Sequence, residues 1–255
     1  MSVKQLIIKL IPKRVKEYIK AQINYECPVP KPTEYVIHTS DLKKLEGKAI
    51  IVTGATGAIG SAVTHQLYIQ GATVGVCGRD MAKISKTIDR IKSENINGEG
   101  QLIPLCIDVT DSISIENGID EFYRQAGKID ALINNAGGGA RGSSKKLWEQ
   151  DIEIIDRVIK TNLQGSILCA RKAAQIMTKQ SSGVIVNMSS VVGMRGKEKM
   201  TDYAAAKAGI IGLTKSLAIE LGKYNIRVNC ISPGMVNQIP FDTGLPIRST
   251  NANCL

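Results

Sequence analysis

The sequence is poor in aromatic side chains, which make up 4% of the 255 residues and include two phenylalanines and one tryptophan. The hydrophobic core must therefore be built from aliphatic side chains, as in buried parallel sheets. No apolar run approaches the roughly 20 residues that span a bilayer, so we expect no membrane-spanning helix. Hydrophobic residues at 43% and charged residues at 22% are ordinary for a globular protein, which excludes wholesale disorder and a fibrous repeat.

Histidine and closely spaced cysteine, the usual ligands of transition metals, are also scarce. The two histidines, His38 and His65, have no partners at metal-binding spacing, so we expect no metal site. No two cysteines form a CxxC pair, and several lie in apolar, strand-like runs. This pattern favours buried free thiols in a reducing cytosol over disulfides. The cysteines are Cys27, Cys77, Cys106, Cys169, Cys230 and Cys254.

Positive charge is concentrated at the start of the chain. The formal net charge is +10, and residues 1–25 carry six basic side chains against Glu17 alone. Apolar residues recur there every three or four positions, which predicts a basic amphipathic helix, interrupted at Pro12. That helix either packs on protein or adsorbs to an anionic membrane surface. Prolines in residues 26–44 predict a connector, and no basic stripe with interleaved aromatics indicates nucleic-acid binding.

From residue 48 onward, strand-like and helix-like segments alternate along the chain. The strand-like segments are expected at residues 49–53, 73–77, 102–109, 129–134, 184–188 and 226–231. Helical spacing fills the intervals, with its longest stretches at residues 147–180 and 202–222. Strict alternation predicts an α/β fold with a doubly wound parallel sheet, the Rossmann fold, over residues 45–236.

A glycine-rich turn follows the first strand-like segment and reads TGATGAIG at residues 53–60. In parallel sheets, ligands bind at the carboxyl ends of the strands. Glycines let the backbone approach a pyrophosphate, and the following helix N-terminus supplies unpaired N–H groups. The turn therefore predicts a dinucleotide site, with close helix–strand packing alone as the alternative.

Tyr203 and Lys207 stand four residues apart in a helix-like segment, so their side chains share one face. A free tyrosine has a pKa of about 10, which is too high for efficient proton exchange at neutral pH. Because a neighbouring ammonium favours the tyrosinate, we expect Lys207 to lower the pKa of Tyr203. Tyr203 could then exchange a proton with the oxygen of a carbonyl or an alcohol.

Four further motifs make the chain resemble the short-chain dehydrogenase/reductase family. They are Asn134-Asn135-Ala136-Gly137, Asn162, Ser190 placed thirteen residues before Tyr203, and Tyr203-Ala-Ala-Ala-Lys207. The stretches YAAAKAGIIGLTKSLAIEL and IRVNCISPG most resemble 3-oxoacyl-(acyl-carrier-protein) reductases. The resemblance implies hydride transfer between a nicotinamide cofactor and a carbonyl or secondary alcohol. Tyr203 would be the proton donor, Ser190 would hold the substrate oxygen, Lys207 would hold the nicotinamide ribose, and Asn162 would support a proton relay.

The resemblance also implies which residues bind the nucleotide. They are Gly54, Thr56, Gly57, Ile59, Gly60, Arg79, Asp108, Val109, Asn135, Ala136, Gly137, Tyr203, Lys207, Pro233 and Gly234. Gly78 stands where an acidic residue would bind the ribose 2′-hydroxyl of NAD(H), and Arg79 suits the 2′-phosphate of NADP(H). NADP(H) is therefore favoured, and the neighbouring Asp80 keeps NAD(H) open.

Three departures from the family pattern affect these expectations. Ala58 replaces a glycine, and the resulting TGxxGxxG resembles the extended subclass, which makes its epimerases and dehydratases the enzymatic alternative. Gln238 stands where a threonine commonly contacts the nicotinamide amide. The chain stops at Leu255, before the last helix and strand of the family, so we expect a sheet without its final strand. Residues 237–255 would be a tail that begins a truncated substrate lid.

Substrate and partners follow less directly from the sequence. We expect a thioester or small-molecule substrate, carried by acyl carrier protein or coenzyme A, in a cytoplasmic enzyme with peripheral membrane contact through residues 1–25. A complete chain would form a homodimer or homotetramer. Ser181 and Tyr224 replace two basic positions of carrier-protein reductases, which leaves a dehydrogenase of sugars, polyols or other alcohols as an alternative. A non-catalytic NADP-binding subunit or an inactive fragment is the alternative from another class.

Overall fold

The computed structural model describes residues 45–94, 100–139, 141–234 and 236. The helix predicted for residues 1–25, the connector for 26–44 and the tail for 237–255 lie outside these residues. These domain assignments therefore stay predictions.

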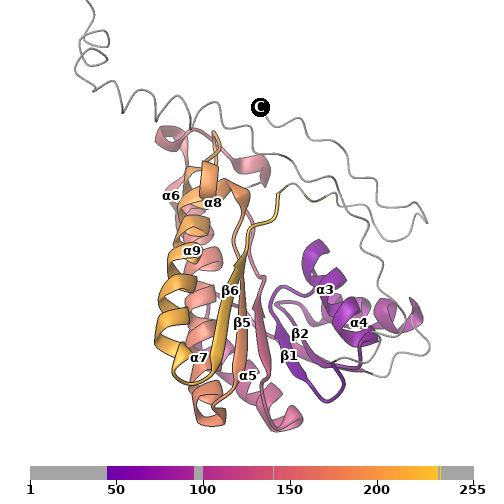
Figure 1. Ribbon diagram of the computed structural model, residues 1–255. Coiled ribbons are helices and arrows are strands. Elements are labelled where there is room, and N and C mark those ends of the chain that lie inside the picture. Colours follow the sequence, from indigo (N-terminus) through magenta and orange to yellow (C-terminus); the bar gives the residue numbers. More distant parts are fainter. Residues whose placement is uncertain (1–44, 95–99, 140, 235, 237–255) are drawn as a thin grey trace, which may run out of the picture. The chain divides into compact units, whose positions relative to one another are not determined.

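A six-stranded parallel sheet forms the centre of the described chain (Figure 1). Its strands are β1 (Ala49–Val52), β2 (Thr73–Gly78), β3 (Gln101–Cys106), β4 (Ala131–Asn134), β5 (Gly183–Met188) and β6 (Ile226–Ile231). Their order across the sheet is β3-β2-β1-β4-β5-β6, with every neighbouring pair parallel. The order reverses between β1 and β4, which is the point where open α/β sheets bind ligands. This topology confirms the doubly wound fold predicted from the alternating segments. Within the described residues, β6 pairs with β5 alone.

Helices cover both faces of the sheet because successive side chains on a strand point to opposite sides. Ile50 and Val52 of β1 pack in one apolar cluster with Ile84, whereas Ile51 packs in another with Phe122. Figure 1 shows α3 and α4 beside β1 and β2, and α7 and α9 beside β5 and β6. The covering helices are α3 (Ala58–Ile69), α4 (Met81–Glu94), α5 (Ser112–Ala126), α7 (Gly165–Gln180) and α9 (Thr201–Gly222).

The region predicted as one helix over residues 147–180 is divided, so that prediction was wrong in detail. It contains η3 (Leu147–Glu149), α6 (Ile152–Ile159), the π-helix η4 (Lys160–Gln164) and α7. A single π-turn inserts one extra residue while the chain stays helical on both sides, so a prediction of one helical stretch did not reveal it; such turns are frequent at functional sites. Two short helices, η2 (Arg141–Ser143) and α8 (Val191–Arg195), were also not predicted from the sequence.

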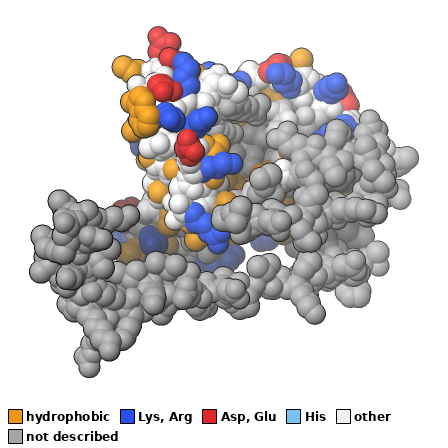
Figure 2. All heavy atoms as spheres, turned by 90° about the horizontal axis from the view of Figure 1, so that it is seen from above, with side chains coloured by type: hydrophobic (Ala, Val, Ile, Leu, Met, Phe, Trp, Pro, Cys, Tyr) orange, Lys and Arg blue, Asp and Glu red, His pale blue; other side chains and the backbone are white. Residues whose placement is uncertain are grey.

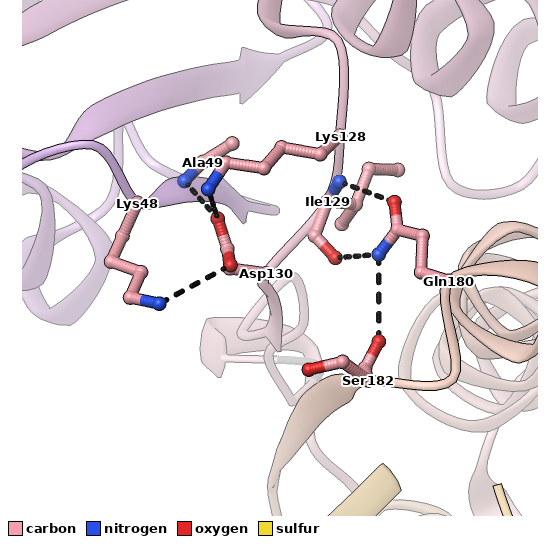
Figure 3. Close-up of polar contacts among 7 residues, drawn as sticks. All are labelled: Lys48, Ala49, Lys128, Ile129, Asp130, Gln180 and Ser182. Carbon is pink, nitrogen blue, oxygen red and sulfur yellow. Dashed lines mark hydrogen bonds and ion pairs between the residues drawn. The ribbon is translucent and has the colours of Figure 1, made fainter. Parts of the chain in front are cut away.

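At the amino ends of the strands, Asp130 links β1 to the start of β4 (Figure 3). Its Oδ2 accepts a hydrogen bond from the backbone N–H of Ala49 at 2.8 Å and lies 3.1 Å from Lys128 Nζ. Its Oδ1 lies 3.5 Å from Lys48 Nζ. Partial burial acts to raise the pKa of Asp130, but the Ala49 bond and the two lysine charges hold that pKa below its ordinary value.

A second polar link lies beside the first. The side chain of Gln180, the last residue of α7, accepts from the Ile129 N–H at 3.0 Å and donates to the Ile129 carbonyl at 2.9 Å (Figure 3). It also lies 3.4 Å from the carbonyl of Ser182. Both links join elements at the amino ends of the strands, away from the carboxyl ends where a ligand would bind.

We expect Asp130→Ala to lower the free energy of unfolding at pH 7 by about 1–3 kcal/mol, because it leaves the buried N–H of Ala49 without an acceptor. Since the folded pKa of Asp130 is lowered, its charge stabilises the fold above the unfolded pKa of about 3.9, and this contribution is lost as the pH falls through the folded pKa. Urea unfolding at pH 7 and pH 3 measures the change. The exposed Asp89→Ala serves as control. An equal difference between wild type and Asp130→Ala at both pH values would contradict the role of the charge.

Candidate active site

A cavity of about 500 Å³ opens at the carboxyl ends of the strands. It is lined by segments that follow β1, β2, β3, β4, β5 and β6 and by residues of η4 and α9. Every residue predicted to bind the nucleotide lines this cavity, as does Ser190, but Asn162 does not. Sequence reasoning missed several other lining residues, namely Ala58, Ile107, Gly138, Thr161, Met188 and Ser189.

The glycine-rich turn packs directly on the turn that follows β4. Gly54 has a φ of +64°, and a Cβ there would lie 2.8 Å from Ala136 Cα. A Cβ on Gly60 would meet the Gly54 carbonyl oxygen and would lie 2.7 Å from Asn135 Nδ2. Gly57 is different, because a Cβ there would meet only the Gly54 carbonyl oxygen at 3.4 Å. Gly54 and Gly60 are therefore required by packing, whereas Gly57 exposes its backbone to the cavity.

Hydrogen bonds fix these two turns to each other. The Thr53 hydroxyl oxygen accepts from the backbone N–H groups of Asn135 and Ala136, both at 3.0 Å. Asn135 Nδ2 in turn donates to the carbonyls of Thr53 and Gly54 at 3.0 and 3.1 Å. The turns after β1 and β4 thus form one rigid floor for the cavity.

Helix α3 points its N-terminus at this floor. Gly57 is its N-cap and makes no side-chain capping bond, and the first turn contains no acidic residue. Ala58 and Ile59, the first two helical residues, line the cavity. Because the first N–H groups of a helix have no partners within the helix, this end can bind a pyrophosphate. Ala58 is exposed, so its methyl group is accommodated without displacing the turn.

Lys207 is held at the edge of the cavity by contacts from two elements. Its Nζ donates to the Met188 carbonyl at the end of β5 at 2.7 Å, and Ser189 Oγ donates to the Lys207 carbonyl at 2.7 Å. Helix α8 packs so closely on α9 that a Cβ on Gly193 would lie 2.7 Å from the Lys207 carbonyl carbon. Burial lowers the pKa of Lys207 to about 8, against an opposing effect of the Cys230 thiol.

Tyr203 lies one helical turn before Lys207, and its ring centroid is 5.6 Å from Lys207 Nζ. Burial raises the pKa of Tyr203, and a hydrogen bond with Ser190 offsets part of this increase. The expectation that Lys207 lowers the pKa of Tyr203 is therefore wrong for this structure. The ammonium lies over the ring and donates to Met188, while burial disfavours the tyrosinate. At neutral pH Tyr203 is a phenol, the form that can donate a proton.

Ser190 and Asn162 occupy different positions relative to the cavity. Ser190 is the N-cap of α8, and its Oγ accepts from the Val192 N–H at 3.2 Å while it faces the cavity. Asn162 is fully buried in η4, where its Nδ2 donates to the Gly138 carbonyl at 2.8 Å and its Oδ1 accepts from the Gly138 N–H at 3.0 Å. A Cβ on Gly137 would meet Asn162 Oδ1 and would lie 3.3 Å from Lys207 Nζ. Asn162 therefore clamps the loop after β4, and its role in a proton relay stays a prediction.

The end of β2 has little space for an acidic side chain. A Cβ on Gly78 would lie 3.2 Å from both Thr56 Cγ2 and Ile84 Cγ1. Arg79 is exposed and lines the cavity. The Oδ1 of Asp80 accepts from the N–H groups at the start of α4, from Ala82 at 2.9 Å and from Lys83 at 3.2 Å.

Asp108 lies beside this corner, because it follows β3, whose last residue pairs with Gly78 at the end of β2. Partial burial acts to raise the pKa of Asp108, but hydrogen bonds from Thr110 and the charges of Arg79 and Lys160 hold it below its ordinary value. The N–H and hydroxyl of Thr110 both donate to Asp108 Oδ1, at 2.9 and 2.8 Å. Its carboxylate is therefore charged at neutral pH and can accept hydrogen bonds from a ligand.

The four described cysteines are free thiols. Cys77 and Cys169 are buried, and burial raises the pKa of both thiols, to about 12 for Cys169. Cys106 is exposed, contrary to expectation, because β3 ends at this residue. Cys27 and Cys254 lie outside the described residues. Within the described ranges, no group of three or more metal-binding side chains occurs, and no helix has the length and apolar character needed to cross a bilayer.

Several large apolar side chains are exposed on η3, α6 and α8. The exposed fractions are 52% for Leu147, 78% for Trp148, 75% for Ile152 and 66% for Met194. Figure 1 places α6 and α8 at the carboxyl ends of the strands, and Figure 2 shows apolar, basic and acidic side chains interspersed when the molecule is viewed from that end. Lys146 Nζ lies 5.2 Å from the Trp148 ring centroid. This end of the molecule is therefore amphipathic.

Comparison with known proteins gives a consistent result. The family model described as short chain dehydrogenase matches residues 48–243. A 3-oxoacyl-(acyl-carrier-protein) reductase of Thermotoga maritima is 39% identical over 206 residues, which cover 81% of this chain and 80% of that protein. A 3-oxoacyl-(acyl-carrier-protein) reductase structure with bound NAD from Brucella melitensis has a TM-score of 0.72 at 33% identity and covers 80% of this chain and 77% of its own. The structure of an NAD+-bound xylitol dehydrogenase has a TM-score of 0.70 at 32% identity, with 75% and 72% covered.

Proposed function

The chain belongs to the short-chain dehydrogenase family, and on that premise we propose that it reduces the carbonyl of a 3-oxoacyl thioester with NADPH. Membership makes it an oxidoreductase that interconverts carbonyls and alcohols with a nicotinamide cofactor. The observation that carries the finer proposal is the pairing of a neutral Tyr203 with Ser190 at the cavity, in a chain that is 39% identical to a 3-oxoacyl reductase. The amphipathic end formed by η3, α6 and α8 also suits an acyl thioester.

The residues that line the cavity fit a dinucleotide. The turn after β1 has no side chain where a Cβ would fill the space against Asn135, and the N-terminus of α3 offers unpaired N–H groups. Lys207, which donates to the end of β5 whereas Arg79 follows β2, would donate to the hydroxyls of the nicotinamide ribose. When bound, the cofactor supplies the hydride.

Side chains of the protein would bind the substrate carbonyl oxygen and transfer a proton to it. Ser190 would donate a hydrogen bond to the substrate carbonyl oxygen and fix its position. The Tyr203 phenol would transfer its proton to that oxygen as negative charge develops there, which is general acid catalysis. Asn162 would keep the Gly138 loop in place beside the reacting groups.

The proposed preference for NADPH is supported by the residues at the end of β2, namely Gly78, Arg79 and Asp80. An acidic side chain at position 78 would crowd Thr56 and Ile84, so the usual acceptor for a ribose 2′-hydroxyl has little room. Asp80 accepts two N–H bonds at the start of α4. Arg79 remains exposed at the cavity and can bind a 2′-phosphate by charge-assisted hydrogen bonds.

We expect Arg79→Ala to raise the dissociation constant for NADPH by about 10- to 100-fold, the loss of a hydrogen bond to a charged group, and that for NADH by less than about threefold. Titration calorimetry with both cofactors measures the difference. Arg90→Ala is the matched control, because Arg90 is an exposed arginine that pairs with Glu94 on α4 at 4.0 Å. An equal loss of affinity for NADPH and NADH would contradict the proposed 2′-phosphate contact.

The substrate is tested by NADPH oxidation with matched panels of 3-oxoacyl thioesters, simple ketones and keto sugars. Highest kcat/KM for a 3-oxoacyl thioester supports the proposal. Preference for a sugar or polyol would favour the alternative suggested by the likeness to a xylitol dehydrogenase. Nucleotide binding without turnover of any panel member would favour a non-catalytic subunit. Comparison of coenzyme A and acyl-carrier-protein thioesters identifies the carrier.

The remaining assignments extend this proposal beyond the described residues. We place the enzyme in the cytoplasm as a homodimer or homotetramer, with peripheral membrane contact through residues 1–25. The basic, amphipathic pattern of those residues supports the contact. Sedimentation with anionic vesicles, before and after deletion of residues 1–25, tests it.

A further inference from the structure

A row of buried polar side chains crosses the sheet beneath the cavity and connects α7 to α9. Asn134 and Asn187 are direct neighbours on β4 and β5, with exposed fractions of 2% and 0%. Asn134 Nδ2 donates to the Ser166 carbonyl on α7 at 3.0 Å and to Asn187 Oδ1 at 2.9 Å. Asn187 Nδ2 then donates to Thr214 Oγ1 on α9 at 3.0 Å. We call these four residues the asparagine bridge.

The bridge reaches α9 on the face that carries Lys207. Thr214 follows Lys207 by seven residues, or two helical turns, and both side chains are buried against the sheet. The Thr214 hydroxyl also donates a hydrogen bond to the Ile210 carbonyl at 2.8 Å. It therefore accepts one hydrogen bond, from Asn187, and donates another. Valine at this position would have nearly the same shape but could do neither.

Three consecutive residues at the end of β5 attach that strand to α9. Asn187 binds Thr214, the Met188 carbonyl accepts from Lys207 Nζ, and Ser189 Oγ donates to the Lys207 carbonyl. Ser190 comes next in the chain. The position of Ser190 relative to Tyr203 and Lys207 therefore depends on the register between β5 and α9. Of these three contacts, only the Asn187–Thr214 bond does not involve Lys207.

The other end of the bridge reaches the π-helix. Ser166 Oγ donates to the Asn162 carbonyl at 3.0 Å, while the Ser166 carbonyl accepts from Asn134. The same row of hydrogen bonds therefore connects the residue that clamps the Gly138 loop with the helix that carries Tyr203. A break in this row would allow the two sides of the reaction site to shift independently.

We propose that Thr214 is a positioning residue: through Asn187 it holds α9 in the register with β5 that places Tyr203 and Lys207 beside Ser190. This inference rests on the proposed function, because it assumes that Tyr203 and Ser190 act on the substrate. Thr214 lies outside the set of residues that line the cavity. Its effect on the reaction would therefore pass through the backbone rather than through contact with a ligand.

Thr87 provides a matched comparison on the other face of the sheet. Thr87 is 8% exposed and Thr214 is 7% exposed, and each hydroxyl donates at 2.8 Å to the carbonyl four residues earlier in its helix. Within the described residues, Thr87 accepts no side-chain hydrogen bond and does not line the cavity. The two threonines thus differ chiefly in the bond from Asn187.

The experiment compares Thr214→Val, Thr214→Ser and Thr87→Val in the full chain with NADPH and the best carbonyl substrate. We expect Thr214→Val to lower kcat about tenfold, since small misplacements of reacting groups have effects of this size or larger, with NADPH affinity changed less than about twofold. Thr214→Ser restores the hydroxyl and should recover most of the lost kcat. Thr87→Val should retain wild-type kcat. Rates are measured well below each melting temperature and per folded subunit.

Tyr203→Phe, measured in parallel, separates this inference from the proposed function. Loss of turnover in Tyr203→Phe with equal kcat for Thr214→Val and Thr87→Val would overturn the positioning role and leave the proposed function standing. A fall in kcat for Thr214→Val that Thr214→Ser does not reverse would also overturn it. The proposed function would be overturned if Tyr203→Phe kept the wild-type turnover, or if the wild-type protein turned over none of the substrates. In either case the positioning role would be overturned as well.

Discussion

Replacing Tyr203 by phenylalanine is expected to lower kcat for carbonyl reduction by about 10²- to 10⁴-fold, the range that general acid catalysis contributes. Phenylalanine keeps the ring that lies 5.6 Å from Lys207 Nζ and removes only the hydroxyl that interacts with Ser190. The dissociation constant for NADPH should therefore change by less than about twofold, because the variant removes no hydrogen bond to the cofactor, a loss that would cost about 0.5–1.5 kcal/mol.

Steady-state kinetics and fluorescence titration with NADPH measure the two quantities. Tyr123→Phe is a suitable control, because Tyr123 lies on α5, is 41% exposed and does not line the cavity. A Tyr203→Phe variant that keeps the wild-type kcat would show that the proton comes from another group. Loss of NADPH binding in the same variant would instead indicate a collapsed cavity.

Gly60→Ala is expected to weaken NADPH binding by about 100-fold or more, which corresponds to losing one or two charge-assisted hydrogen bonds. The new Cβ would meet the Gly54 carbonyl oxygen and would lie 2.7 Å from Asn135 Nδ2 and 2.9 Å from Ala55 Cα. Two of these atoms belong to the backbone, and the third, Asn135 Nδ2, is already hydrogen-bonded to backbone carbonyls. None of them can therefore move without disturbing the turn. The turn must shift, and the N–H groups that it presents to the cavity move with it. Overpacking of this kind should also cost about 1–3 kcal/mol of stability.

Gly212→Ala is the control, because Gly212 is also a helical glycine but a Cβ there would meet nothing within 4 Å. Alanine at that position should leave NADPH binding unchanged and stabilise the protein by roughly 0.5–1 kcal/mol, since glycine is unfavourable inside a helix. Titration calorimetry and thermal unfolding compare the variants. Wild-type affinity in Gly60→Ala would contradict the requirement for close packing at the turn.

Local patterns predicted the parts of the site that depend on neighbours in sequence. The spacing of Gly54 and Gly60 within one turn, and of Tyr203 and Lys207 on one helix, is visible in the sequence, and all four residues line the cavity. Alternation of segments was sufficient for the parallel sheet. Its strand bounds were less accurate, because residues 107–109 and 129–130 lie outside the strands to which they were assigned.

The properties that escaped prediction depend on tertiary contacts. The pKa of Tyr203 was expected to fall, but burial raises it and outweighs the hydrogen bond with Ser190. Met188 and Ser189 have no motif of their own, and their place at the end of β5 is the one signal that could have marked them as lining residues. The π-turn around Asn162 and the use of Asp80 as a helix cap likewise follow from the path of the backbone rather than from residue type.

The attachment of the turn after β1 to the turn after β4 also determines when the nucleotide site can first exist. Thr53 and Asn135 are bonded although they are 82 residues apart in the chain, and α3, β2, α4, β3, α5 and β4 lie between them. Closing so long a loop costs conformational entropy before the contact forms, and non-local pairing of this kind slows folding. During synthesis, the glycine-rich turn leaves the ribosome early but has no partner until β4 has followed it. The first half of the nascent chain therefore cannot be stabilised by nucleotide, and protection by the cofactor begins only after residue 136 has emerged.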